Sequence, residues 1–194
     1  MKKILSDLKT SLIIFFSLSI LLGIVYPLFI YGIGYFFFPD KANGSLVYDK
    51  TRQIVIGSEL IGQQFSSMKY FHSRPVRDSG KDPQNSSGNN LGPTSKKLQD
   101  SFESDIVKYQ KINKLSPNIL IPIDAVTSSF SGLDPHISVR NAELQMPRVA
   151  KARNIEEKEI SILIEKFTEK PFLGVLGQKR VNVLLLNIAL DEIK

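Results

Sequence analysis

The sequence contains no cysteine and only two histidines among its 194 residues. The absence of cysteine is compatible with any cellular compartment and does not choose between them. His72 and His136 lie far apart in the chain, so they do not form a metal-binding motif. A carboxylate site for a hard cation stays open, although no cluster of Asp and Glu has the spacing of metal ligands. The sequence therefore predicts no metal site.

Nucleotide-binding motifs are also missing. Gly57 and Gly62 have the spacing of a phosphate-binding loop, but Gln63 stands where that loop requires lysine. There is no Gly-x-Gly-x-x-Gly either. The letters Asp49-Lys50-Thr51 match the start of the phosphorylation motif of P-type ATPases, but the following residues differ and the chain is far too short for such an enzyme. We interpret this match as a coincidence.

Charge is absent from the long stretch between Lys9 and Asp40. Its apolar part, residues 12–38, forms a helix of roughly 40 Å, compared with about 30 Å for the hydrocarbon core of a bilayer. The alternative is a cleavable signal peptide, but the apolar part of a signal is only about 7–15 residues and no small-residue cleavage site follows here. The sequence therefore predicts an uncleaved single span between residues 1–11 on one side and a domain of residues 39–194 on the other.

The charges that flank the span favour one orientation. Three lysines precede it within nine residues, and three basic residues follow it at wider spacing (Lys2, Lys3 and Lys9; Lys41, Lys50 and Arg52). Positive residues concentrate on the cytoplasmic side, and a long domain can cross the membrane largely regardless of its charge. We expect a cytoplasmic N-terminus and an extracytoplasmic main domain. The net charge of +6 includes no Lys/Arg block, so the sequence does not predict nucleic-acid binding.

One face of the predicted span carries small residues. Ser19, Gly23 and Pro27 are spaced by four, which places them on the same side of a helix where another helix can approach closely. Pro27 also removes the backbone hydrogen bond to the carbonyl of Gly23, so we expect a kink there. We predict that this face contacts a partner helix within the bilayer.

The rest of the chain predicts a single mixed α/β domain of the α+β class. A strand pair is expected at 45–49 and 52–56, and a long polar loop at 77–97. Apolar residues at spacings of three and four predict a helix over about 95–113. A second helix follows Ser138 and is bent or ended by Pro147, and a third begins with Asn154 as its cap. Residues 181–186 predict a buried strand that passes into a short helix.

Two segments carry candidate functional residues. Ser131, Asp134 and His136 suggest a hydrolase, but the serine lacks a Gly-x-Ser-x-Gly elbow, and the segment is more typical of a tight turn. Gln145, Arg148 and Arg153 follow on the second helix, where Gln145 and Arg148 are neighbours on one face and suit a phosphate or an acidic partner. A solvated basic face is the alternative interpretation.

Taken together, several motifs in a fixed order resemble one known family. They are Tyr26-Pro27 in the span, Asn43–Leu46, Gly57–Phe65, Tyr70–Pro75, Asn90–Thr94, Ser131–Ser138, Ala142–Arg153 and Val181–Asp191. In this order they resemble the C subunit of bacterial Kdp-type potassium-transporting ATPases almost from end to end. The chain departs from the family's usual pattern at Asn89, Phe130, Val139 and Pro147.

The resemblance implies a non-catalytic accessory subunit of an ATP-driven potassium importer in the bacterial inner membrane. Its expected partners are a potassium-binding channel-like subunit, an ATP-hydrolysing P-type subunit and a small single-span subunit, besides the lipid bilayer. The resemblance further implies a role in assembly and a chaperone effect that raises the ATP affinity of the hydrolysing subunit, with nucleotide contact credited to Gln145.

These implications translate into expected sites. Arg148 and Arg153 are the candidates beside Gln145 for holding phosphate, and the chain is expected to hold no cofactor of its own, ATP being reached through the complex. The expected docking surface comprises the span face and the turn (Ser19, Gly23 and Pro27; Ser131, Gly132, Leu133, Asp134, Pro135 and His136). The remaining alternatives are a stand-alone nucleotide-binding module and a membrane-anchored hydrolase.

Overall fold

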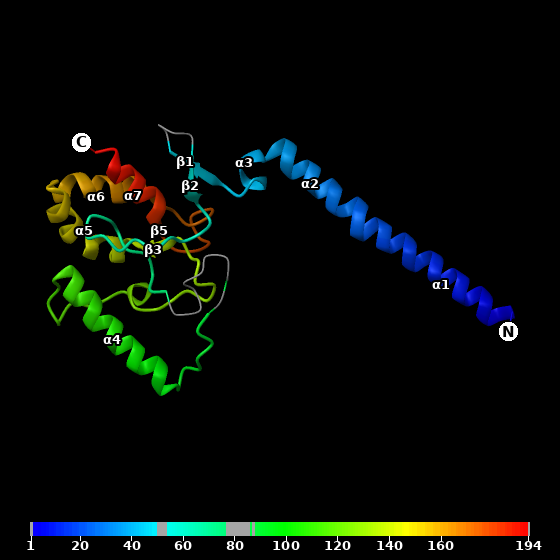
Figure 1. The fold of residues 1–194 in the computed structure, drawn as a ribbon, viewed down its shortest axis with the longest axis horizontal. Coiled ribbons are helices and arrows are strands. Elements are labelled where there is room, and N and C mark those ends of the chain that lie inside the picture. Colours follow the sequence, from blue (N-terminus) through cyan, green and yellow to red (C-terminus); the bar gives the residue numbers. More distant parts are fainter. Residues whose placement is uncertain (1, 50–53, 77–85, 87, 194) are drawn as a thin grey trace. The chain divides into compact units, whose positions relative to one another are not determined.

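The computed structural model describes residues 2–49, 54–76, 86 and 88–193, and the chain divides into two compact units after Leu46. The first unit is dominated by one long helix, blue in Figure 1. It consists of α1 (Lys2–Ile20), a π-helical turn η1 (Leu21–Val25) and α2 (Tyr26–Phe37), and the short helix α3 (Pro39–Ala42) follows it. Among the described residues, Lys2–Phe37 is the one helix that is long and apolar enough to cross a membrane.

The π-helical turn lies where the sequence predicts a disturbance. Pro27 has no N–H, and its ring would press on the carbonyl four residues back in a regular α-helix. The helix widens just before it, and the Tyr26 N–H donates to Leu21 O, five residues back. A single wide turn is a common way for a helix to absorb such a conflict. The expected kink thus takes the form of a π-helical turn.

The second unit combines two small sheets with four longer helices. β1 (Leu46–Tyr48) pairs with β2 (Val55–Ser58). The other sheet has the antiparallel order β3-β5-β4, with Ile137 opposite Val181 in register. The strands of this sheet are β3 (His136–Ser138), β4 (Thr168–Glu169) and β5 (Arg180–Asn182). The helices of the second unit are α4 (Lys96–Asn113), the 3-10 turn η3 (Ile123–Ala125), α5 (Val139–Arg153), α6 (Glu157–Lys166) and α7 (Val183–Asp191).

The hydrophobic core lies where α5, α6 and α7 meet the three-stranded sheet (Figure 1). Fully buried side chains come from each of these elements and from one segment without regular structure (Ile137, Val149, Ile160, Val181, Leu186, Leu190 and Phe71). The helix α4 contributes a half-buried apolar face, and Asn113 at its end is its buried residue. The core therefore depends on the C-terminal half of the domain.

The fold class is confirmed: a long apolar N-terminal helix precedes an α+β domain. The helix over 95–113 and the small strand pair are also confirmed, although the second strand begins at Val55. Within the predicted polar loop at 77–97, residues 77–85 and 87 lie outside the described residues, and the described residues up to Ser95 form no helix or strand. Its last residues are the helical start of α4, since that helix begins at Lys96.

Two local expectations are wrong, and one of the two outcomes expected at Pro147 is excluded. Asn154 does not cap the third helix; it ends α5 in the left-handed conformation at φ 58°, which asparagine tolerates well. Pro147 does not end the second helix, because α5 continues through it with buried residues on both sides (Leu144, Gln145, Val149 and Ala150), and a bend there stays a prediction. The strand at 181–186 ends at Asn182, whose side-chain oxygen accepts the Leu185 N–H and starts α7.

Candidate functional site

A short segment, Met68–His72, is held mainly by side chains from other elements. We call it the clamped segment. It forms neither helix nor strand: it begins in an exposed turn and becomes buried at Phe71, and its backbone groups hydrogen-bond to side chains of α5 and α7. Since buried backbone groups need hydrogen-bond partners, these side chains replace the partners that a sheet would supply. The clamp comprises Gln145, Arg148 and Arg153 of α5 and Asn187 of α7.

Gln145 uses both ends of its amide in this clamp. Its Oε1 accepts the His72 N–H at 2.7 Å, and its Nε2 donates to His72 O at 3.1 Å. The same Nε2 donates to Asn141 Oδ1 at 2.9 Å, and Oε1 also accepts from Arg148 Nη2 at 2.7 Å. The side chain is 1% exposed. The buried amide of Gln145 therefore hydrogen-bonds to His72 in the way that a neighbouring strand's backbone would.

Arg148 lies next to it and is equally occupied. Its Nη1 donates to Met68 O at 2.7 Å and Tyr70 O at 2.9 Å, and its Nε donates to Asn113 Oδ1 at 2.8 Å. Burial lowers the pKa of Arg148 to about 10, so the guanidinium stays charged at neutral pH. One buried cation thereby joins the clamped segment to the end of α4.

Arg153 and Asn187 complete the clamp. Arg153 donates to Lys69 O at 2.7 Å and to Asp191 Oδ1 at 2.6 Å, and its guanidinium lies 4.8 Å from the centre of the Tyr70 ring. Asn187 accepts the Phe71 N–H at 2.8 Å and donates to Phe71 O at 3.0 Å. The sequence motifs that contain Gln145 and Arg148, and Tyr70 and Phe71, are therefore hydrogen-bonded to one another in a single unit.

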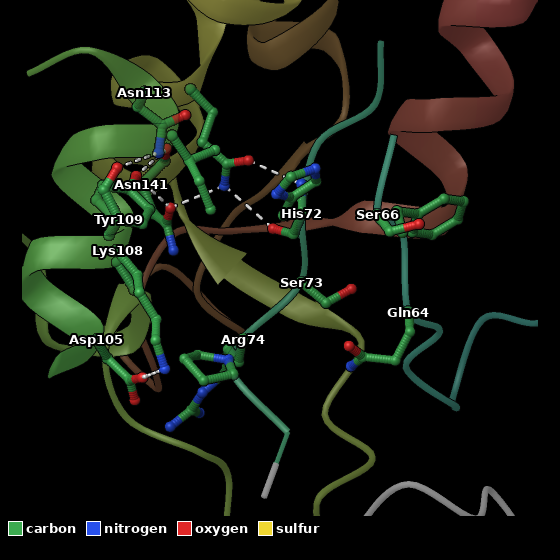
Figure 2. A pocket seen from close by; sticks show the side chains of 15 residues that line it. Gln64, Ser66, His72, Ser73, Arg74, Asp105, Lys108, Tyr109, Asn113 and Asn141 are labelled. Atoms are coloured by element: carbon green, nitrogen blue, oxygen red, sulfur yellow. Dashed lines mark hydrogen bonds and ion pairs between the residues drawn. The ribbon is translucent and has the colours of Figure 1, made fainter. Parts of the chain in front are cut away.

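A pocket of about 340 Å³ has Gln145 in its wall. Figure 2 shows the pocket between α4, which carries Lys108 and Tyr109, and the segment that carries His72 and Ser73. Its wall combines apolar and polar groups from α4, α5 and residues 64–75 (Phe65, His72, Arg74, Lys108, Tyr109, Ile112, Asn141 and Gln145). Lys108 lies 3.8 Å from Asp105 across one turn of α4. A pocket of this kind can receive a small polar ligand.

Burial shifts the pKa values of two titratable side chains in the pocket wall, His72 and Tyr109. Burial and the cation of Arg148 lower the pKa of His72, so its imidazole is neutral at pH 7. Burial and the nearby Asp124 raise the pKa of Tyr109, whose hydroxyl donates to Asn141 Oδ1 at 2.8 Å. Neither group is poised to exchange a proton near neutral pH. The pocket therefore offers hydrogen bonds and charged groups of both signs, and His72 and Tyr109 do not form an acid–base pair.

The turn at Ser131–His136 is fixed by a chain of polar contacts that joins Arg74, Asp134, His136 and Glu169. Arg74 Nη1 donates to Asp134 Oδ2 at 2.8 Å. His136 lies between two carboxylates, with Nδ1 3.5 Å from Asp134 Oδ1 and Nε2 3.2 Å from Glu169 Oε1. Burial by itself raises the pKa of Asp134, but hydrogen bonds from His136 and Arg74 lower it to about 2. This chain ties the turn to β4 and to residue 74, just after the clamped segment.

The hydrolase hypothesis needs Ser131 beside His136, and the turn arranges them differently. Ser131 Oγ accepts the Leu133 N–H at 3.1 Å and lies 3.4 Å from Ser129 Oγ. Both nitrogens of His136 face carboxylates instead. Across the described part of the chain, no three His, Cys, Asp or Glu side chains gather as metal ligands. The turn has the geometry of a structural link, without an activated nucleophile.

The span residues fall on three parts of the long helix. Ser19 belongs to α1, Gly23 to the π-helical turn and Pro27 to the first turn of α2. A Cβ placed on Gly23 would meet no atom within 4 Å. The surface at Gly23 is therefore open to another helix, and the predicted partner contact stays a prediction.

Sequence reasoning missed the amides that complete the clamp. Asn113, Asn141 and Asn187 are each nearly fully buried, and each hydrogen-bonds to another clamp or pocket residue. The available signal was their position on otherwise apolar helix faces, as for Asn187 between Leu186 and Leu190. A buried polar residue on such a face indicates a specific partner elsewhere in the fold.

Comparison with known proteins gives a single family. Residues 8–192 match the family described as KdpC, the c chain of K⁺-transporting ATPase. A protein of Mycobacterium tuberculosis named potassium-transporting ATPase KdpC subunit is 50% identical over 194 residues and is covered completely, as is this chain. Subunits of the same name from Caulobacter vibrioides and Bradyrhizobium diazoefficiens are 46% and 43% identical, with 96% and 97% of this chain and 93% and 98% of those proteins covered. The chain, with the long apolar helix Lys2–Phe37 and its clamped α+β domain, belongs to the KdpC family of potassium-transporting ATPase subunits.

Proposed function

We propose that the chain is a non-catalytic subunit that stabilises the assembled potassium-import ATPase. The observation that carries this proposal is the clamp. Three side chains of α5 donate hydrogen bonds to the backbone of Met68–His72; they are Gln145, Arg148 and Arg153. Residues engaged in this way shape a rigid domain surface and are not free for chemistry. The domain is therefore suited to binding neighbouring subunits.

The partners in this proposal are a channel-like potassium-binding subunit, an ATP-hydrolysing P-type subunit and a small single-span subunit. The long helix would contact them through the face of Ser19, Gly23 and Pro27, and the domain through the turn Ser131–His136. The open surface at Gly23 supports the first contact, because close helix packing in membranes requires small residues.

The test compares two glycines of the same helix. Gly32 is also free of neighbours within 4 Å, and it lies nine residues after Gly23, about two and a half turns along, on the opposite face. Co-purification of the complex should fail or fall strongly with Gly23→Leu and persist with Gly32→Leu. Intact complexes with both variants would remove this face from the proposed interface.

The proposal also covers the raised ATP affinity of the hydrolysing subunit. We propose that this effect is indirect, with the nucleotide held by the partner and none bound here as a resident cofactor. The rival is direct contact in the pocket beside Gln145. Lys108 is 69% exposed at the pocket wall and is its most available cation. An indirect effect predicts an unchanged KM for ATP in the complex with Lys108→Ala, and direct phosphate contact predicts a raised KM.

The orientation belongs to the same proposal: N-terminus in the cytoplasm, domain outside. The chain has no cysteine, so Ser116→Cys places a single thiol at an exposed position of the domain. A membrane-impermeant thiol reagent should label this variant in intact cells. Labelling only after lysis would place the domain in the cytoplasm and favour direct contact with ATP.

A further inference from the structure

A small loop of the domain exposes four large apolar side chains. Residues Phe172–Leu176, which we call the apolar loop, lie between β4 and β5. Phe172, Leu173, Val175 and Leu176 are 70%, 78%, 78% and 60% exposed. The loop is nevertheless ordered by its own backbone: the Phe172 N–H donates to Leu176 O at 2.9 Å and the Leu176 N–H to Phe172 O at 3.0 Å. The apolar side chains are thus presented on a closed turn.

The tip of the loop is conformationally strained. Leu173 has φ 52°, in the left-handed region, and Gly174 follows at φ 78°. Glycine or asparagine adopts this region easily, whereas a leucine there is an outlier. Leu173 is also too exposed to contribute to the core. A bulky apolar residue that is both strained and mostly exposed indicates a contact outside the domain.

The charges around the loop indicate the chemistry of that contact. Lys170 precedes the loop and Lys179 follows it, both exposed, and no acidic residue occurs from Lys170 to Arg180. Protein–protein interfaces are depleted in lysine. An apolar tip flanked by lysines is instead typical of segments that enter a bilayer surface, where apolar groups partition and cations meet anionic headgroups.

We propose that the apolar loop inserts into the interfacial layer of an anionic lipid bilayer, with Lys170 and Lys179 at the headgroups. The chain itself provides the proximity. The linker from the end of the long helix at Phe37 to Val47 spans at most about 36 Å when extended. This linkage keeps the domain at high effective concentration beside any bilayer that holds the helix, so a weak individual contact suffices. The loop would be a second membrane contact of the subunit.

The test uses the absence of tryptophan from the chain. The full-length Leu173→Trp variant carries a single fluorophore at the tip of the loop. It is reconstituted into phosphatidylglycerol–phosphatidylcholine vesicles with or without brominated acyl chains. Phe130→Trp is the matched control, because Phe130 is an aromatic residue that is 87% exposed and flanked by serines at 129 and 131.

Insertion predicts a blue-shifted emission and about twofold quenching by brominated lipid for Leu173→Trp, with little quenching for Phe130→Trp. Adding Lys170→Gln and Lys179→Gln to Leu173→Trp should reduce the quenching, and so should vesicles of phosphatidylcholine alone. Equal quenching of the two tryptophans, or none at Leu173→Trp, would overturn the proposal. Absence of quenching in vesicles together with a blue shift only in the assembled complex would assign the loop to a partner subunit instead.

Discussion

The backbone N–H and C=O groups find their hydrogen-bond partners in opposite ways in the long helix and in the clamped segment. In Lys2–Phe37 the hydrogen bonds run between residues four or five apart in the chain, even through the π-helical turn. In Met68–His72 most of them run to side chains 73 to 116 residues away, and two run to Ser67 nearby. The helix needs no other element to satisfy its backbone, as a segment in a bilayer must. The clamped segment depends on α5 and α7 for most of its backbone hydrogen bonds.

This difference determines how each region responds to substitution. A substitution in the long helix leaves its backbone hydrogen bonds intact, so we expect small, local effects on stability. In the clamp a single side chain carries several backbone bonds at once, and its loss leaves several buried acceptors without partners. Substitutions in the two regions test this contrast, and we expect the largest loss of stability in the clamp.

Arg148→Met should destabilise the domain most. The substitution removes the donor from Asn113 Oδ1 in a buried site and from Met68 O and Tyr70 O in partly buried ones, with an expected cost of about 3 kcal/mol. Arg140→Met is the control on the same helix, because Arg140 is exposed and pairs only with Glu143 at 3.4 Å; its expected cost is within about 0.5 kcal/mol. Denaturant unfolding in detergent, followed by circular dichroism, measures both. Similar losses for the two variants would contradict the clamp.

Asp134→Asn should have an intermediate effect that depends on pH. Because hydrogen bonds from His136 and Arg74 and the charge of Arg74 hold the pKa of Asp134 at about 2, below its unfolded value near 3.9, its ionised form stabilises the fold. That contribution is present above pH 4 and is lost as the pH falls towards 2. We expect Asn to cost roughly 1–2 kcal/mol at pH 7, allowing for solvent screening.

The measurement is the difference in unfolding free energy between the unsubstituted chain and the variant at pH 5 and pH 3. The difference should shrink at pH 3. Asp100→Asn, at an exposed position of α4, controls for the change in net charge and should show no such trend. A difference that is constant with pH would mean that the carboxylate is not stabilised by its neighbours.

Gly23→Ala should have the smallest effect in the isolated subunit. A methyl group there meets no atom within 4 Å, and alanine favours a helix over glycine. The thermal stability of the helix in detergent should stay the same or rise slightly. A clear loss would show that Gly23 is needed by the π-helical turn itself and not by a partner.

The same contrast explains what sequence reasoning could predict. The long apolar helix and α4 follow from patterns within one segment, so both were predictable. The exit from β5 was not, because Asn182 can either extend a strand or cap a helix and the choice depends on its contacts. Asn154 likewise suits both ends of a helix.

The candidate site illustrates the limit further. The sequence singled out Gln145, Arg148 and Arg153 as binding residues because polar side chains on one helix face resemble a ligand site. Their partners are backbone groups of Met68–His72, which no spacing rule reveals. Only the fold brings these two segments together, and it shows the three residues engaged with the chain's own backbone.

The clamp also sets an order of events during protein synthesis. Phe71 is translated 116 residues before Asn187, its hydrogen-bonding partner. At about 5–20 residues per second, roughly ten seconds separate the two. During this interval the apolar helix has already left the ribosome, while the domain still lacks the residue that closes it. Membrane insertion of the subunit thus precedes the folding of its domain.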